Sequence, residues 1–140
     1  MNVMDPVNNF RDLGGISCSG NLYFRQGLIY RSAKPEKFSL RDEKLFHSLK
    51  IKTLIDLRPE IEQNIDHLLL PGQQHITFPV DITPRVKEKI KPLLMDRNSS
   101  MEITKVFLDL YEEMVFLFHP FLKDIFTLLS VKENYPVLIH

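Results

Sequence analysis

The chain has 140 residues, the length of one domain, and its 44% hydrophobic and 26% charged residues exclude a disordered or low-complexity protein. Its 18 basic side chains balance 18 acidic ones, so bulk charge favours neither nucleic-acid binding nor adhesion to a membrane surface. The single cysteine, Cys18, excludes an internal disulfide and a cysteine-rich zinc site. Residues 1–10 contain no apolar run and no stretch approaches the length of a membrane span, so we expect neither a signal peptide nor a membrane-spanning segment. We therefore expect a soluble cytoplasmic protein with no nucleic-acid partner.

The first third of the chain predicts loops and short strands. Residues 9–15 are rich in turn formers and end in Gly14-Gly15, a pair that tolerates positive φ and close backbone approach. Residues 22–24 and 28–30 are β-prone runs on either side of Gln26-Gly27, a pattern that predicts a hairpin between them.

The middle of the chain predicts a helix and two strands. Ser39 can cap the first turn of a helix that presents Leu45, Phe46 and Leu49 on one face. Residues 51–57 are short, apolar and rich in β-branched residues, which is typical of a buried strand. Residues 75–80 are a second strand candidate, and Pro79 places it at an edge or at a strand end.

The last third predicts two helices and a final strand. Apolar residues recur at helical spacing over 102–118, and Pro120 suits the first turn of the helix that follows. The preceding segment, 84–95, is a mixed helix or loop that Pro92 interrupts. Residues 137–139 read as a buried strand.

Alternating helices and strands favour an α/β fold, in which a site lies beyond the carboxyl ends of the strands. Asp56 and Arg58 follow one predicted strand, Asp81 follows a second, and His140 follows the last. One interpretation pairs Arg58 with Glu62 in a structural ion pair, and the other places Arg58 beside an anionic ligand; the structural pair is favoured.

Metal and nucleotide motifs are missing from the sequence. No two histidines have the spacing of a zinc helix or finger, and no glycine-rich nucleotide loop is present, so we expect no metal and no cofactor. A phosphate-binding cysteine loop needs Cys-x5-Arg, but six residues separate Cys18 from Arg25. Cys18 is therefore predicted to be an incidental thiol.

Four segments in this order resemble a known family. Asn9-Phe10-Arg11-Asp12-Leu13-Gly14-Gly15, residues 27–33, residues 53–58 with Glu62 downstream, and residues 135–140 look like the bacterial and fungal tyrosine-phosphatase-like family with the Asn-Phe-Arg-Asp-Leu-Gly-Gly signature. Its members are atypical cysteine phosphatases of dual-specificity or phosphoinositide type.

The resemblance implies the three-layer α/β sandwich of cysteine phosphatases, of which residues 1–140 would be a single incomplete domain, the N-terminal part. In the family, the strand that ends in histidine continues into a Cys-x5-Arg loop. The sequence stops at His140, so the nucleophile and the phosphate-binding arginine are expected just after it, and the chain alone is expected to be an inactive portion of a hydrolase. His140 would then orient the loop, and Asp81 is an alternative general acid. The remaining site-supporting residues would be Arg11, Asp12, Gly14, Gly15 and Asp56.

The complete protein would hydrolyse a phosphorylated protein or phospholipid through a cysteinyl-phosphate intermediate, without metal. The alternative is a non-catalytic α/β fragment that binds phosphate or a partner protein. An apolar central strand needs cover on both faces, so self-association or pairing with the protein's own C-terminal segment is also expected.

Overall fold

A computed structural model describes residues 9–33, 40–63, 72–94 and 100–140. Contacts divide the chain into two compact units. The sheet unit comprises Met1–Pro79 and Leu129–His140, and the helical unit comprises Val80–Leu128. None of the helices in the described ranges is both long and apolar enough to cross a bilayer.

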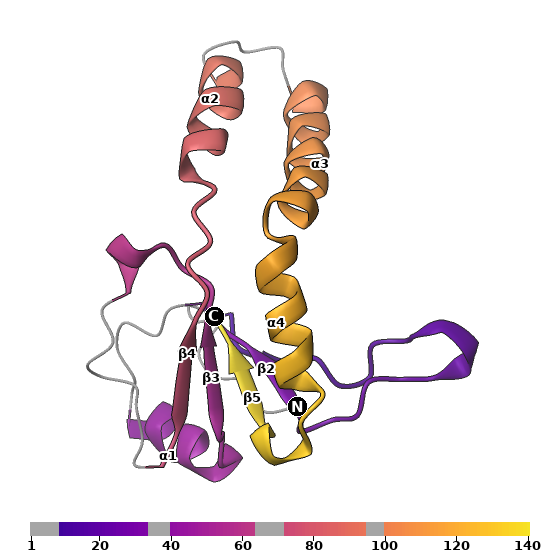
Figure 1. Ribbon diagram of the computed structural model, residues 1–140, viewed down its shortest axis with the longest axis vertical. Coiled ribbons are helices and arrows are strands. Elements are labelled where there is room, and N and C mark those ends of the chain that lie inside the picture. Colours follow the sequence, from indigo (N-terminus) through magenta and orange to yellow (C-terminus); the bar gives the residue numbers. More distant parts are fainter. Residues whose placement is uncertain (1–8, 34–39, 64–71, 95–99) are drawn as a thin grey trace. The chain divides into compact units, whose positions relative to one another are not determined.

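Among the described residues, the sheet unit has five strands in the order β1-β2-β5-β3-β4. Figure 1 labels β2, β5, β3 and β4 of this sheet. β2, β5, β3 and β4 are parallel, and β1 is the antiparallel edge strand. The strands are β1 (Arg11–Asp12), β2 (Ile29–Arg31), β3 (Thr53–Asp56), β4 (Gln74–Thr77) and β5 (Val137–Ile139). This mixed architecture confirms the α/β class, and β5, the last strand in sequence, lies at the centre of the sheet.

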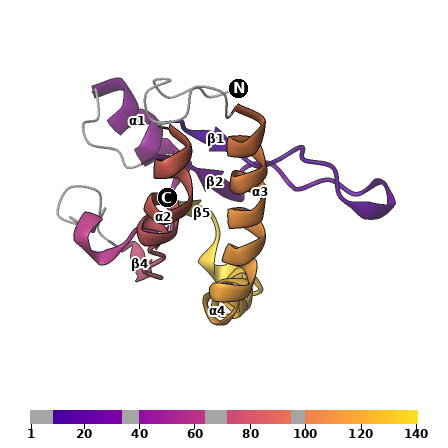
Figure 2. The ribbon, with the colours of Figure 1, turned by 90° about the horizontal axis from the view of Figure 1, so that it is seen from above.

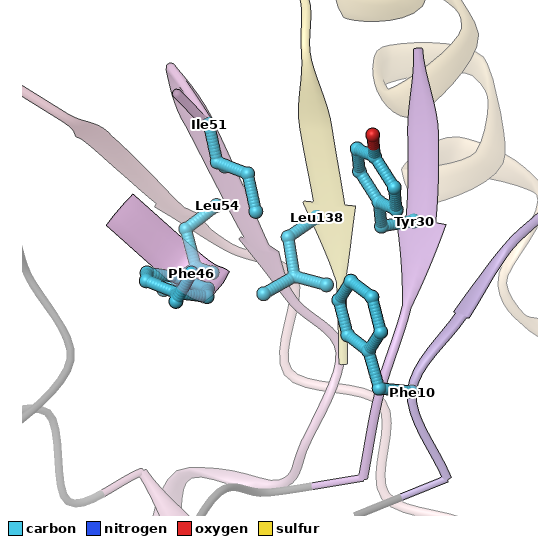
Figure 3. Packing of buried hydrophobic residues seen from close by; sticks show 6 residues of the cluster. All are labelled: Phe10, Tyr30, Phe46, Ile51, Leu54 and Leu138. Carbon is cyan, nitrogen blue, oxygen red and sulfur yellow. The ribbon is translucent and has the colours of Figure 1, made fainter. Parts of the chain in front are cut away.

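One face of the sheet carries the core of this unit. The register places Leu54, Leu138 and Tyr30 side by side on β3, β5 and β2, so their side chains share a face. Helix α1 (Leu40–Leu49) adds Phe46 to the same cluster, and the Phe10 ring stacks on Tyr30 with centroids 5.4 Å apart (Figure 3). The helix predicted after Ser39 is confirmed, although Ser39 and its cap lie outside the described residues.

The predicted hairpin between residues 22–24 and 28–30 is wrong. β2 already has a partner on each side, β1 and β5, so it has no free edge for another strand. Residues 22–24 fold back on the preceding segment instead: the Phe24 amide donates to the Ile16 carbonyl at 2.9 Å, and the Cys18 amide donates to the Leu22 carbonyl at 2.7 Å. Gly20, at φ 72°, makes the reversal possible.

Three longer helices run through the second half of the chain: α2 (Thr83–Leu94), α3 (Ser100–Leu117) and α4 (His119–Leu129). α2 and α3 lie side by side (Figure 2). Lys89 of α2 forms an ion pair with Glu113 of α3. The helices expected at 102–118 and after Pro120 are confirmed. The expected interruption at Pro92 is wrong: Pro92 lies in the last turn of α2, and the helix continues two residues beyond it to Leu94. The described part of the chain also contains short 3-10 turns at Ser19–Asn21, Glu60–Glu62 and Lys132–Asn134.

Candidate active site

The carboxyl ends of the central strands β3 and β5 are tied together by the backbone. The His140 amide donates to the Ile55 carbonyl at 3.0 Å, and the Leu57 amide donates to the His140 carbonyl at 2.7 Å. The parallel ladder therefore continues one residue beyond β5 and fixes His140 beside Asp56. This is the edge at which the sequence predicted a site.

Three polar side chains meet on the face of the sheet that carries the core. His75 pairs in register with Leu54, and Asp56 and His140 follow Leu54 and Leu138 by two residues. Residues two apart on a strand point to the same face. Accordingly, the Nε2 atoms of His140 and His75 lie 3.8 Å and 3.9 Å from Asp56 Oδ2.

Asp56 is fully buried and is neutralised by Arg58. The guanidinium binds the carboxylate at two points, Nε to Oδ1 at 2.9 Å and Nη2 to Oδ2 at 2.6 Å, and the Arg58 amide donates to Oδ1 at 3.0 Å. Burial alone would raise the pKa of Asp56, but these hydrogen bonds and the nearby charges outweigh it and hold the pKa below its usual value. Asp56 is therefore a carboxylate at neutral pH.

His140 is neutral at the same pH. Its side chain is 2% exposed, and burial lowers its pKa to about 4, against the attraction of Asp56 and with the help of Arg58 and His75. Neither ring nitrogen has a hydrogen-bond partner among the described residues. A buried imidazole with both nitrogens free is unusual, because buried polar groups are nearly always paired.

Arg58 does contact Glu62, but not in the way expected. Its Nη1 donates to the Glu62 backbone carbonyl at 2.8 Å, while the carboxylate that it binds is that of Asp56. The i,i+4 ion pair needs a helical turn after Arg58, whereas Pro59 is extended, with ψ 150°, and a 3-10 turn follows at Glu60–Glu62. The interpretation of Arg58 and Glu62 as a side-chain pair is therefore corrected, and the structural role of Arg58 is kept.

This geometry predicts that Glu62→Ala is nearly silent. The substitution keeps the backbone carbonyl that Arg58 uses, so we expect the free energy of unfolding to change by less than about 0.5 kcal/mol in urea denaturation. A loss of about 1–3 kcal/mol would restore the side-chain ion pair as the partner of Arg58.

Arg11 and Asp12 lie on the edge strand β1. Arg11 pairs in register with Arg31, at the carboxyl end of β2, and so lies at the same edge of the sheet as the candidate site. Asp12 has a local role: its carboxylate accepts the amides of Gly14 and Gly27, each at 2.7 Å.

Gly14 and Gly15 lie at the opposite end of β2, because β1 runs antiparallel to it and the chain leaves β1 toward the start of that strand. A Cβ on Gly14 would lie 2.4 Å from the Gln26 Cα, which explains the glycine by packing rather than by a ligand. The structure does not bring this pair together with Asp56 and His140.

Asp81 is the second residue of the helical unit, and its Oδ1 accepts the Thr83 amide at 2.9 Å, an interaction that supports the start of α2. Its role as general acid stays a prediction. Cys18 is exposed, at the turn that reverses the chain after Ile16, and its lack of a catalytic role also stays a prediction.

His75 is the member of the cluster that the sequence alone did not identify. It lies at the second position of β4, and only the pairing of β4 with β3 shows that it faces Asp56. Ser32, at the carboxyl end of β2, is another polar residue at this edge of the sheet that the sequence alone did not identify. Its buried hydroxyl has no hydrogen-bond partner within the described part of the chain.

Fold and site thus define an α/β protein whose candidate site lies at the carboxyl ends of a central parallel strand pair. A sequence profile described as the tyrosine phosphatase family matches residues 3–140, so the chain belongs to that family. A candidate tyrosine-protein phosphatase from Cupriavidus necator is 35% identical over 62 residues, which are 44% of this chain and 23% of that protein. The match thus spans about a quarter of the relative's length, and family membership supports a phosphatase function.

Proposed function

We propose that this chain supplies the sheet and the supporting side chains of a cysteine-dependent phosphomonoesterase that acts on phosphorylated protein side chains or phosphoinositides. The observation that carries the proposal is the position of His140. It ends the central strand of the sheet, is buried, and is held by backbone hydrogen bonds beside the Asp56–Arg58 pair. In the family that the chain resembles, this is the strand that leads into the Cys-x5-Arg loop.

The proposed reaction has two steps. A thiolate of that loop attacks phosphorus and forms a cysteinyl phosphate, while an acid protonates the leaving oxygen. Water then attacks the cysteinyl phosphate, which releases inorganic phosphate and regenerates the thiolate. Loop amides and the loop arginine would stabilise the negative charge that develops on the phosphoryl oxygens.

Side chains of this chain would hold the loop in position. Asp56 fixes Arg58, and Arg58 in turn holds the backbone after β3 through the Glu62 carbonyl. Because Arg58 is attached at both points, the backbone after β3, next to His140, is held rigidly. A catalytic loop needs rigid supporting residues of this kind. His140 would contribute through its fixed backbone and its buried ring rather than as an acid, because its pKa of about 4 keeps it unprotonated at pH 7.

The test is hydrolysis of para-nitrophenyl phosphate by the 140-residue chain and by a longer chain from the same reading frame that contains a Cys-x5-Arg loop. We expect no hydrolysis by the first and turnover by the second, lost when the loop cysteine is changed to serine. Cys18→Ser in the longer chain is the matched control and should keep full activity. Hydrolysis by a sample whose intact mass ends at His140, or loss of activity in the Cys18→Ser protein, would refute the proposal.

A non-catalytic role in binding phosphate or a partner protein is the second candidate. Large apolar side chains that lie exposed on α3 favour it, among them Phe107, Tyr111 and Phe116. They also favour the predicted self-association or pairing with a C-terminal segment. If the protein is a binding module, the longer chain would bind para-nitrophenyl phosphate but would not hydrolyse it. The same hydrolysis assay therefore separates the two functions.

A further inference from the structure

Three potential metal ligands converge from three adjacent strands. Asp56 follows the core residues of β3, His75 lies on β4, and His140 follows β5. Each offers one ligand atom, and these atoms all lie within 4.8 Å of one another. The spacing of the histidines along the sequence did not reveal this group. Its members come from three different strands and are brought together by the register of the parallel sheet, not by one helix or loop.

The distances suit a shared ion better than direct contact. At 3.8 Å and 3.9 Å from Asp56 Oδ2, the Nε2 atoms of His140 and His75 are too far for a hydrogen bond. Two ligands of a tetrahedral zinc ion, each about 2.0–2.1 Å from the metal, lie roughly 3.4 Å apart. An inward movement of a few tenths of an ångström would bring both Asp56–His pairs to this separation, and the ligand atoms of the third pair, His75 and His140, lie within 4.8 Å of each other.

His140 provides an independent observation. Its side chain is 2% exposed, and both of its nitrogens are unpartnered within the described residues. A metal would supply the partner that this buried imidazole lacks.

Arg58 limits the affinity of this group of ligands for a metal cation. It uses both carboxylate oxygens of Asp56, but Oδ2 accepts only one hydrogen bond from it, so a second lone pair on Oδ2 remains. The guanidinium charge beside the site opposes a dication, so removing it should tighten binding.

We propose that Asp56, His75 and His140 form a binding site for Zn²⁺ or a similar transition-metal dication, with three protein ligands and an open fourth position. Two imidazoles and a carboxylate are a donor set that zinc accepts. Metal binding would tie His140 and Asp56 to each other at the carboxyl ends of β3 and β5. The site is a property of this chain and does not depend on the proposed phosphatase reaction.

The test is titration of metal-free protein with ZnCl₂ in competition with a chromophoric chelator, together with the thermal melting temperature at each zinc concentration. We expect one equivalent to bind and the melting temperature to rise, because a ligand that binds only the folded chain stabilises it. His75→Ala should weaken zinc binding at least tenfold and abolish the rise in melting temperature. His75 is the best site for the change, because its side chain is partly exposed and its loss should not unfold the protein.

Two control variants exclude adventitious binding. His47, on the exposed side of α1, and the exposed Cys18 are the matched sites, and His47→Ala and Cys18→Ser should bind zinc as the unchanged chain does. His140→Gln, measured at a temperature where circular dichroism shows a folded chain, should lose binding as His75→Ala does. No binding to the unchanged chain, equal binding by the His75→Ala protein, or loss of binding in either control would overturn the site.

Discussion

Asp56→Ala should be among the most destabilising single substitutions in the sheet unit, costing about 3–5 kcal/mol of unfolding free energy. The variant removes a fully buried carboxylate and leaves the Arg58 guanidinium, only 11% exposed, without its counter-charge. It also removes the acceptor of the Arg58 amide, which turns the chain after β3. Such a loss is a large part of the total stability of a domain, so the melting temperature should fall by roughly 10–20 °C.

Two comparison variants separate charge from hydrogen bonding and from non-specific effects. Asp56→Asn keeps one oxygen acceptor but loses the charge, so we expect an intermediate loss of about 1–3 kcal/mol. Glu88 pairs with Arg85 on the exposed surface of α2, and Glu88→Ala should cost less than about 0.5 kcal/mol. Urea denaturation measures all three, and a silent Asp56→Ala variant would show that the pair is not needed for the fold.

Much of the fold follows from local sequence patterns. Strand β5 matches the predicted residues 137–139, and α3 and α4 match their apolar periodicity, because these signals lie within one segment. The hairpin was predicted wrongly for the opposite reason. Residues 22–24 and 28–30 carry the right residue types, but only the remote partners of β2 decide which of them belong to the sheet.

The sequence predicted which edge of the sheet carries the site, but not which side chains contact one another there. Asp56 and His140 were expected together, because the carboxyl ends of parallel strands meet at one edge. The ion partner of Arg58 was missed because that prediction assumed a helical turn where the chain is extended at Pro59. His75 was missed because a lone histidine in a strand gives no signal until the register shows what lies opposite.

Acidification should destabilise the metal-free chain between pH 6.5 and about pH 4 through His140. Burial lowers the folded-state pKa of His140 to about 4 from 6.5, so in this window the unfolded chain takes up a proton that the folded chain refuses. Stability therefore falls as the pH falls, by roughly 2–3 kcal/mol over the window. Asp56, whose pKa lies below its usual 3.8, contributes stability that is lost only at still lower pH.

Urea denaturation in EDTA at a series of pH values tests this dependence. His140→Gln removes the titrating ring and should flatten the profile between pH 6.5 and about pH 4, even if the variant is less stable throughout. His47→Gln, at an exposed position on α1, should leave the slope unchanged. The groups that face His140 are Asp56, Arg58 and His75, so an unflattened His140→Gln profile would assign the proton uptake elsewhere. The direction of the pH dependence distinguishes the two possible charge states of the His140 ring. If Asp56 held the ring as a cation, the protein would instead lose stability as the pH rises.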